Sequence, residues 1–336
     1  MRFPMHVVTD MVRWQMANWW RGNKRYPYVL MLEPLYTCNL ACVGCSPERY
    51  SGDLKDRLSL DDCFRAVDEA GAPVVSICGG EPTVYPELID LVKGILARKK
   101  QIFLCTNGLL LDRFYRRAQP HKRLAINVHL DGMRATHDRV VRRAGVFDRA
   151  IEMIREGQRL GYRLCTNTTV YRETDIDELE ALMRLVSSLC IDGMLISPGY
   201  HYERIDGDHF LYKAEIHEKF RRVRELAERY RVDSTPLFLE FAAGLRDYPC
   251  TPWGNPTRTP HGWKGPCYLI EDRLYPTWND FWNGVDWDYW EKRTDPRCRN
   301  CMMHSGFEPS VVRHLGESMS DVAAMARWNF SAQPRT

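Results

Sequence analysis

The stretch Cys38-Asn-Leu-Ala-Cys42-Val-Gly-Cys45 places three cysteines four and three residues apart, shortly after the apolar run Tyr28-Val-Leu-Met-Leu. Thiolates are the ligands that soft, iron-rich centres prefer, and a 4Fe-4S cluster normally binds four of them. A compact set of three therefore predicts a cluster in which one iron is left open for another ligand. The spacing alone leaves two alternatives: a zinc site with a distant fourth ligand, or three unrelated buried thiols.

Length and composition set the broad class. With 336 residues, of which 44% are apolar, the chain can form one large domain with a smaller appendage. The net charge of +3 does not indicate a nucleic-acid partner. Twelve cysteines in a chain of this length, some tightly spaced, favour metal binding in a reducing cytoplasm over a disulfide scaffold. We expect neither a signal peptide nor a membrane-spanning segment, because no sufficiently long apolar run is present.

Strand-like and helical patterns alternate from residue 28 onward, and parallel strands need such crossover helices. The sequence therefore predicts an α/β fold with a parallel sheet, in which functional residues gather at the carboxyl ends of the strands. The expected strands are Tyr28–Leu32, Val74–Cys78, Gln101–Cys105, Leu124–Leu130, Arg163–Val170 and Met194–Ser197. The expected helices are Leu60–Ala70, Pro86–Arg98, Asp148–Leu160 and Asp177–Leu189, followed by a charged helical segment over 203–232.

The two ends of the chain differ from this pattern. Val8, Met11, Val12, Met16 and Trp19 recur at helical spacing and predict an amphipathic helix within residues 1–27. Such a helix either lies in a lipid headgroup layer or packs across the mouth of its own domain. After residue 245 the sequence becomes rich in Pro, Gly and Trp. We therefore expect a barrel domain over 28–245, a C-terminal module over 246–312 and a helical tail over 313–336.

A second motif, Gly79-Gly80-Glu81-Pro82, follows the second expected strand. Paired glycines let a backbone approach a ligand closely, although the motif alone is equally typical of a tight turn. Its position one βα unit after the cysteine loop makes the combination specific. The two motifs together resemble the radical S-adenosylmethionine (radical SAM) superfamily.

That resemblance implies a partial (β/α)6 barrel that binds a 4Fe-4S cluster through Cys38, Cys42 and Cys45. The open iron would bind the amino and carboxylate groups of S-adenosylmethionine, and the turn Gly79–Pro82 would receive the methionyl ammonium. Reductive cleavage of the sulfonium would then give methionine and a 5′-deoxyadenosyl radical. A flavodoxin- or ferredoxin-type donor is the implied source of the electron.

A closer resemblance, from Gly22 to about Val312, is to the adenosylhopane synthase family of hopanoid biosynthesis. It rests on several stretches: Gly22-Asn-Lys-Arg-Tyr-Pro, Leu30-Met-Leu-Glu-Pro-Leu, Gly71-Ala-Pro-Val-Val-Ser, Leu104-Cys-Thr-Asn, Val128-His-Leu-Asp-Gly, Ser197-Pro-Gly-Tyr and Cys250-Thr-Pro-Trp-Gly-Asn-Pro-Thr-Arg. The resemblance implies addition of the adenosyl radical to the terminal alkene of diploptene, a hopene, and a hydrogen-atom quench by Cys105. From the residues alone, Cys105 is either such a donor at a strand end or a buried structural thiol.

Polar residues at the remaining strand ends are candidates for orienting the cofactor in a mostly apolar pocket. His129 could equally be a core histidine, and Asp131-Gly132 could be a simple turn. The candidates for bonds to the ribose, methionyl carboxylate or adenine are Asn107, His129, Asp131, Asn167 and Ser197.

The C-terminal module contains a second thiol set: Cys250, Cys267, Cys298 and Cys301. Four thiolates suit either an auxiliary iron–sulfur cluster, which softness favours, or zinc. Ser305 stands where another cysteine is expected. Nearby tryptophans form either a core or lid, or an apolar wall for a large terpene: Trp278, Trp282, Trp287 and Trp290.

Two departures from the adenosylhopane synthase pattern keep other functions open. Ser46-Pro47-Glu48 replaces a Gly-Lys continuation, and Cys78 replaces a proline. A different terpenoid alkene is therefore an alternative substrate. A peptide-modifying radical SAM enzyme is less favoured, because we expect no leader-binding domain ahead of Cys38. The non-enzymatic alternative is an iron–sulfur electron carrier or redox-responsive binding protein. Peripheral contact with the inner membrane surface also stays open.

Overall fold

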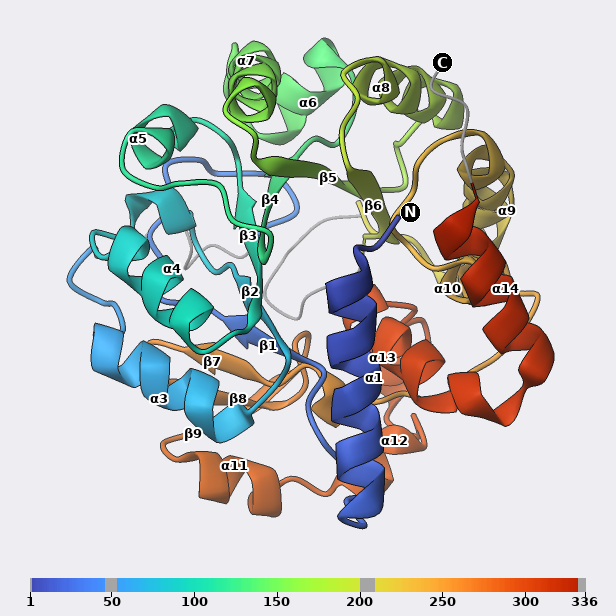
Figure 1. Ribbon diagram of the computed structural model, residues 1–336. Coiled ribbons are helices and arrows are strands. Elements are labelled where there is room, and N and C mark those ends of the chain that lie inside the picture. The colour runs from blue at the N-terminus through green and yellow to red at the C-terminus, as the bar shows by residue number, and fades with distance from the viewer. Residues whose placement is uncertain (1, 46–52, 200–208, 332–336) are drawn as a thin grey trace.

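The computed structural model describes residues 2–45, 53–199 and 209–331. Within them one sheet of nine strands forms the centre of the molecule (Figure 1), in the order β6-β5-β4-β3-β2-β1-β7-β8-β9. The sheet does not close on itself. The strands are β1 (Val29–Leu32), β2 (Val74–Ile77), β3 (Gln101–Thr106), β4 (Leu124–His129), β5 (Arg163–Val170), β6 (Gly193–Pro198), β7 (Thr257–Thr259), β8 (Gly262–Pro266) and β9 (Glu271–Tyr275).

All six expected strands are present and pair in parallel, which confirms the predicted α/β fold. Three further strands come from the Pro-, Gly- and Trp-rich region, where short strands left no clear alternation in the sequence. Among these, β7 pairs in parallel with β1, and β8 and β9 continue the sheet in antiparallel fashion. The C-terminal module is thus built onto the same sheet as the six parallel strands.

Helices cover the outer face of the parallel strands (Figure 1). Local signals explain their limits: Ser59 caps the first of these helices by accepting from the Asp62 N–H, and Gly71 ends it in the left-handed conformation. The helices are α3 (Leu60–Ala70), α4 (Leu88–Ala97), α5 (Leu111–Tyr115), α6 (Arg134–Val140), α7 (Val146–Arg159), α8 (Ile176–Ser188), α9 (Lys213–Arg229) and α10 (Pro236–Ala242). The first six residues of the predicted charged segment, 203–208, lie outside the described residues.

The C-terminal tryptophans pack mainly against one another. Trp278 stacks on Trp282 with ring centroids 4.8 Å apart, and Trp263 meets Trp278 edge-on at 4.7 Å. They form the core between β8 and its helices, so the core alternative holds rather than the substrate wall. The elements here are η2 (Pro252–Gly254), α11 (Trp278–Gly284), α12 (Trp287–Glu291), η3 (Pro296–Cys298), α13 (His304–His314), η4 (Leu315–Glu317) and α14 (Met319–Phe330).

The predicted N-terminal helix is α1 (Met5–Trp20). It packs against its own domain at the end of the sheet where the strands begin, opposite the cysteine loop. His6 contacts Gln101, the first residue of β3, at 3.3 Å, and Asp10 pairs with Arg123 just before β4. The Trp14 indole donates to the Pro27 carbonyl ahead of β1. Across the described ranges, the search for a helix long and apolar enough to span a bilayer finds none.

Candidate active site

The cysteine loop follows β1 and is fastened to the chain by backbone hydrogen bonds. The Val43 N–H donates to the Val140 carbonyl at 2.9 Å, and the Cys45 N–H donates to the Cys42 carbonyl at 3.2 Å. Leu40 packs with Val141 and Val146 in a small apolar cluster, and the Cys38 and Cys42 side chains lie against it. The loop is therefore supported mainly by the turn between α6 and α7.

The two glycines of the second motif allow a close approach to the chain that leads into Cys38. A Cβ on Gly80 would lie 2.1 Å from the Thr37 carbonyl oxygen, and Gly79 has a φ of +100°. The Gly80 and Glu81 N–H groups donate to the Leu35 and Thr37 carbonyls at 2.9 Å each. Any larger residue at position 80 would push these two segments apart.

The Glu81 carboxylate is buried and acts as a brace between β2 and β3. It accepts from the Thr106 hydroxyl at 2.7 Å, from the Asn107 N–H at 2.8 Å and from the Thr83 N–H at 3.0 Å. The Asn107 amide in turn donates to Asn39 Oδ1, inside the cysteine loop, at 2.7 Å. Two of the predicted cofactor-binding residues, Glu81 and Asn107, thus use these side-chain groups to hold the loop in place.

The three loop thiols suit a metal centre by their chemistry. Burial and neighbouring thiols raise the pKa of Cys42, and burial raises the pKa of Cys38 to about 11. Buried thiols that disfavour each other's charge need a cation to become thiolates, and an iron–sulfur cluster supplies one. Within the described ranges, no three His, Cys, Asp or Glu side chains are grouped as a metal-binding set.

Cys105 lies near the end of β3, on the inner side of the sheet. Its neighbours Leu104 and Ile102 are fully buried on the helix-covered side, whereas Cys105 is only half-buried. Its Sγ lies 3.5 Å from Ser76 Oγ, and Asn127 is its register partner on β4. Burial raises the pKa of this thiol, so it keeps its hydrogen at neutral pH.

His129 and Asp131 form a second polar group at the end of β4. His129 Nε2 lies 2.7 Å from Asp131 Oδ2, and the Thr169 N–H donates to Asp131 Oδ1 at 2.8 Å. Burial works to lower the pKa of His129, but the Asp131 carboxylate outweighs it and the pKa is raised. Burial lowers the pKa of the adjacent His137 to about 4, so His137 is neutral and accepts from the Asp131 N–H through Nδ1.

Around these strand ends, the buried atoms Asn127 Oδ1, Asn167 Oδ1 and His137 Nε2 have no hydrogen-bond partner among the described residues. Buried acceptors and donors are costly to leave unpaired, so such atoms indicate a polar ligand or water. Ser197, buried on β6, is the register partner of Thr169. The donor and acceptor set fits the ribose, adenine and methionyl groups of S-adenosylmethionine.

Sequence reasoning did not identify Ser76, Asn127 or Asn39. For Asn127 the signal was present, because it lies two residues before His129 and side chains two apart on a strand share a face. Ser76 stands in the same relation to Cys78. Asn39 gave no such signal, since its role depends on the approach of a distant strand end.

Among the C-terminal thiols, Cys250 interacts with the other three. Burial raises its pKa well above the ordinary value, and the charges of Cys301, Cys267 and Cys298 raise it further. A Cβ on Gly306 would lie 3.0 Å from Cys250 Sγ. Cys267 follows β8, Cys298 ends η3 and Cys301 precedes α13. This set also fits a metal centre by donor chemistry.

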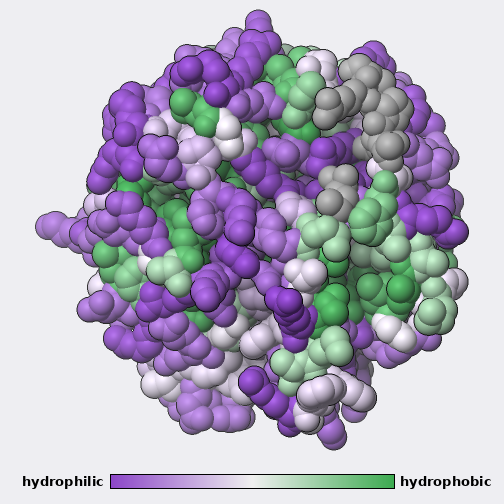
Figure 2. Space-filling view, in the orientation of Figure 1, coloured by the Kyte–Doolittle hydropathy of each residue, from purple (hydrophilic) through white to green (hydrophobic). Residues whose placement is uncertain are grey.

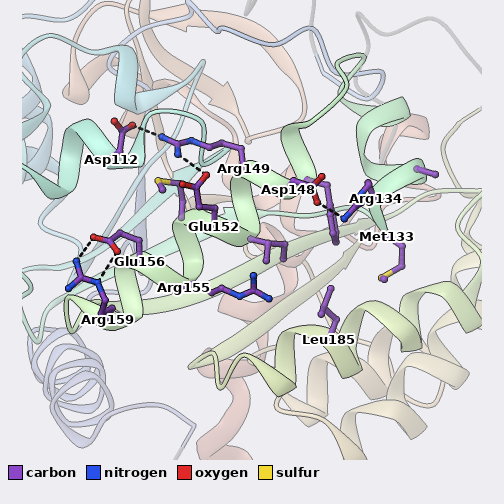
Figure 3. A pocket seen from close by; sticks show the side chains of 14 residues that line it. Asp112, Met133, Arg134, Asp148, Arg149, Glu152, Arg155, Glu156, Arg159 and Leu185 are labelled. Atoms are coloured by element: carbon purple, nitrogen blue, oxygen red, sulfur yellow. Dashed lines mark hydrogen bonds and ion pairs between the residues drawn. The ribbon is translucent and has the colours of Figure 1, made fainter.

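A surface groove lies away from all of these residues, on the outside of α7 (Figure 3). Its charged side chains mostly pair: Arg134 with Asp148, and Arg149 with Asp112 and Glu152. Arg155 points into it without a marked partner. None of the predicted site residues lines this groove.

Comparison with known proteins agrees with the two motifs. The family model described as "Radical SAM superfamily" matches residues 32–186, which include the cysteine loop, the Gly79–Pro82 turn and the ends of β3 to β5. By this match, residues 32–186 form a radical SAM domain. Radical SAM proteins bind a 4Fe-4S cluster and S-adenosylmethionine, and they are enzymes. A second model, described as "Domain of unknown function (DUF3463)", matches residues 194–325.

Individual radical SAM relatives have different activities. The chain is 24% identical to GTP 3′,8-cyclase from Clostridium perfringens over 251 residues, covering 68% of this chain and 77% of the relative. It is 28% identical to Fe-coproporphyrin III synthase from Methanosarcina barkeri, covering 44% and 38% of the two chains. The comparisons do not bear out the finer resemblance to adenosylhopane synthase.

Solved structures support the fold. Streptococcus suis SuiB bound to S-adenosylmethionine has a TM-score of 0.60 and 16% identity, and the match covers 81% of this chain and 67% of SuiB. The enzyme anSMEcpe, with AdoMet and a peptide bound, has a TM-score of 0.56 and 14% identity, covering 90% and 99%. Both structures are of radical SAM proteins with bound S-adenosylmethionine, and at this identity they establish the architecture alone.

Proposed function

We propose that this radical SAM enzyme adds the 5′-deoxyadenosyl group of S-adenosylmethionine to the terminal alkene of a hopene, diploptene, and completes the product with a hydrogen atom. The observation that carries the proposal is the Cys105 thiol, held protonated on the inner side of β3 between Ser76 and Asn127. A protonated thiol is a suitable hydrogen-atom donor, because its S–H bond is weaker than a tertiary C–H bond.

The candidate site residues have different roles in this proposal. Cys38, Cys42 and Cys45 hold the cluster, whose reduction with bound S-adenosylmethionine supplies methionine and a 5′-deoxyadenosyl radical. Glu81 and Asn107 keep the cysteine loop in position. His129, Asp131, Asn167, Ser197 and the carbonyl-lined turn at Gly79–Pro82 would orient the cofactor.

Cys105 gives its hydrogen atom to the substrate carbon: the S–H bond breaks, a C–H bond forms, and a thiyl remains. One electron from the reductase partner and one proton restore the thiol.

The inner face of the sheet also suits an apolar substrate. Met31 on β1, Phe103 on β3 and Leu195 on β6 are half-buried and alternate with fully buried neighbours that face the helices. Apolar side chains that remain partly accessible inside a sheet can contact a large hydrocarbon. They support a terpenoid substrate over a strongly polar one.

The decisive test is an anaerobic assay of the reconstituted enzyme with S-adenosylmethionine, a reductant and diploptene, analysed by mass spectrometry. We expect an adenosylated C35 product. Product from a different terpenoid alkene, with none from diploptene, would keep the adenosyl transfer and overturn the substrate. Turnover only on a peptide would favour the alternative of peptide modification. If S-adenosylmethionine is never cleaved, the enzymatic proposal is wrong, and the alternative of an iron–sulfur electron carrier is favoured.

We further propose that Cys250, Cys267, Cys298 and Cys301 bind an auxiliary 4Fe-4S cluster. Softness favours iron–sulfur over zinc for an all-thiolate set, although both occur. Anaerobically reconstituted wild-type protein should contain about eight irons per chain, and C298A/C301A about four. Zinc in place of the second set of irons would contradict this assignment, as would equal iron content in the two proteins.

We also propose peripheral contact with an anionic membrane through α1 and α14. On α1, Met5, Val12, Met16 and Trp19 share one outward face, and Trp19 and Trp20 are 73% and 77% exposed. The Asp10 carboxylate is turned inward to Arg123, and the cations Arg13, Arg21 and Lys24 stay exposed around the stripe. Basic residues beside exposed tryptophans are typical of helices that lie in a headgroup layer.

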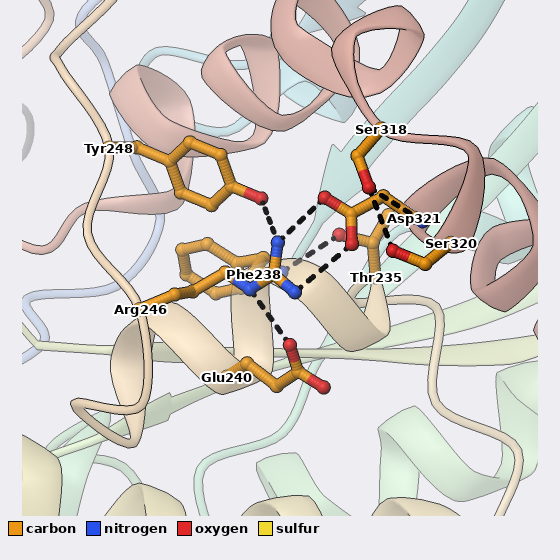
Figure 4. Close-up of polar contacts among 8 residues, drawn as sticks. All are labelled: Thr235, Phe238, Glu240, Arg246, Tyr248, Ser318, Ser320 and Asp321. Carbon is orange, nitrogen blue, oxygen red and sulfur yellow. Dashed lines mark hydrogen bonds and ion pairs between the residues drawn. The ribbon is translucent and has the colours of Figure 1, made fainter.

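The outward face of α14 is apolar as well, with Met319 81% and Phe330 59% exposed. Its acid, Asp321, is drawn inward by the Arg246 guanidinium, which also bonds Glu240 (Figure 4). The start of α1 meets the end of α14, where the Arg2 N–H donates to the Asn329 carbonyl. Figure 2 shows apolar side chains gathering on the right of this side of the molecule, where Figure 1 places α1 and α14.

Flotation with vesicles of phosphatidylglycerol and phosphatidylcholine tests this contact. Because each substitution removes apolar area from the lipid, W19S/W20S/F330S should bind about tenfold more weakly or worse. The control L54S/Y212S removes exposed apolar groups elsewhere and should bind as wild type does. Unchanged flotation of the triple variant would contradict the proposal. So would a wild-type dimer that the same substitutions convert to monomer, since a second copy would then cover the surface.

A further inference from the structure

The end of α6 and the turn after it carry three exposed arginines that form no ion pair with any described residue: Arg139, Arg142 and Arg143, hereafter the arginine turn. Among the described residues the one side-chain hydrogen bond of these guanidinium groups is from Arg139 to Thr136 Oγ1 at 3.5 Å. Residues 134–149 contain five arginines and two aspartates, in a chain whose total net charge is only +3. Positive charge is thus concentrated at this place.

The two aspartates of the segment do not neutralise the arginine turn. The Asp138 carboxylate accepts from the Gly145 and Phe147 N–H groups at 2.7 and 2.9 Å, at the start of α7. Asp148 is 2.8 Å from Arg134. Acidic groups that are already bonded leave the exposed guanidinium groups to act outward as a positive patch.

The arginine turn lies directly against the cysteine loop. Val140, between the first two arginines, accepts from the Val43 N–H, and Val43 follows Cys42 in sequence. Val141 packs in the same small cluster as Leu40, Cys38 and Cys42. Whatever docks on the three arginines is therefore separated from the loop thiols by a single layer of side chains.

Arg142 adopts a left-handed backbone conformation that glycine would adopt with less strain. Its φ is +54°, in the left-handed region, which costs a non-glycine residue on the order of 1 kcal/mol. Gly145, three residues on, has a φ of +81°. The chain thus uses glycine at one left-handed position of the turn and arginine at the other.

We propose that the arginine turn is the docking surface for an acidic one-electron carrier protein of the flavodoxin or ferredoxin kind. The inference rests on the proposed function only in that the cluster at Cys38, Cys42 and Cys45 receives its electron from outside, and it does not depend on the substrate. Transient redox encounters use small, polar and charge-complementary surfaces, generally below about 1,200 Å². Three cations beside the loop that holds the cluster satisfy that description.

The primary test is equilibrium binding of oxidised flavodoxin and oxidised ferredoxin to the cluster-loaded protein. We expect R139E/R142E/R143E to weaken binding of at least one carrier by about tenfold or more, because rim charges set encounter strength. Raising salt from about 50 to about 300 mM should weaken wild-type binding strongly and variant binding little. R142G keeps the left-handed turn while removing one charge, so it should bind less tightly without losing thermal stability.

A matched control reverses three exposed arginine or lysine residues elsewhere: R117E/K122E/R155E. No ion pair is assigned to these three within the described ranges, and Arg155 appears unpaired in Figure 3. Lys122 lies just before β4, and Arg155 is in the second half of α7, both towards the end of the sheet where strands begin. The control should bind both carriers as wild type does, within about twofold.

The rate of electron transfer from the carrier provides a second measurement. Formation of 5′-deoxyadenosine should become slower for R139E/R142E/R143E with reduced carrier, and stay as in wild type with dithionite.

The inference is overturned if neither carrier binds the wild-type protein, if the control weakens binding equally, or if R142G and the triple variant bind normally. Loss of oligonucleotide binding in the triple variant, with carrier binding intact, would instead assign the patch to nucleic acid. A failed diploptene assay beside normal carrier binding would overturn only the substrate proposal.

Discussion

At the scale of single residues, the surroundings of each cysteine determine whether its thiol keeps its proton or suits a metal. Cys105 and the loop cysteines are all thiols with raised pKa values, yet their surroundings differ. Burial raises the pKa of Cys105 and keeps it as a thiol, against the opposing effect of the hydrogen bonds from the neutral groups of Ser76 and Asn127. Cys38 and Cys42 are bordered by other thiols, an arrangement that becomes favourable when a metal takes their protons' place.

Replacing Cys105 by alanine or serine separates carbon–carbon bond formation from the quench. Adenosylated material should still form, whereas the saturated product should fall by about a hundredfold or more, since neither side chain can donate a hydrogen atom readily. Serine retains a hydroxyl that can bond Ser76, so it is the conservative variant. The measurement is product analysis by mass, with Cys165→Ala as the control that removes another buried thiol of the sheet. Normal saturated product from Cys105→Ala would remove Cys105 from the mechanism.

At the scale of elements, a carboxylate on α13 bonds to the start of α10. Glu308 on α13 accepts from the N–H and the hydroxyl of Thr235, at 2.9 and 2.8 Å, at the N-cap of α10. Burial raises the pKa of Glu308 to about 7, the Thr235 bonds oppose the rise, and the Asp233 charge adds to it. Burial therefore favours the protonated carboxyl, although the two bonds from Thr235 favour the ionised form.

The contribution of Glu308 to the free energy of unfolding decreases as the pH rises. Because the folded pKa of about 7 exceeds the ordinary value of 4.5, the contribution is fully present below pH 4.5 and lost as the pH rises through 7. The loss should be on the order of 2 kcal/mol. Glu308→Gln, which cannot ionise, should show a flatter decline in the free energy of unfolding between pH 5 and pH 8. Equal slopes for the two proteins, measured by denaturant titration, would contradict the assignment.

At the scale of the molecule, apolar packing stabilises the sheet. Its core consists of apolar residues between the strands and helices α3 to α10, and the cysteine loop belongs to a separate small cluster. The loop is tied down by Gly80, Glu81 and Val43 through protein hydrogen bonds. We therefore expect a metal centre to order the loop locally and to leave the sheet unchanged.

Removing iron should leave the fold intact. Far-UV circular dichroism of the apo protein should match that of the holo protein within about a tenth, because the secondary structure does not depend on the cluster. Amide exchange should rise in residues 38–45 and around the four C-terminal thiols, and stay unchanged in β2 to β5. Global loss of protection on iron removal would show that the clusters hold the sheet together.

Features that depend on local sequence patterns could be predicted from the sequence, whereas features that depend on contacts between distant residues could not. The parallel strands and their helices followed from local periodicity, and all six expected strands were confirmed. Strands β7 to β9 were missed, because Gly262–Pro266 and its neighbours are too short and irregular to show alternation. The bracing by Glu81 could not be predicted either, since it joins the ends of β2 and β3 only after the sheet has formed. The site assignments that rest on resemblance stay predictions.

The pairing of β7 with β1 has a consequence for electron flow. Strand β1 leads into Cys38, and β8 leads into Cys267, so one cysteine of each thiol set directly follows a strand of the same hydrogen-bonded sheet. The distance between metal centres at these two places would then be set by the sheet. Tunnelling between them would then run at a constant intrinsic rate, and only the energies of the two centres could regulate its direction.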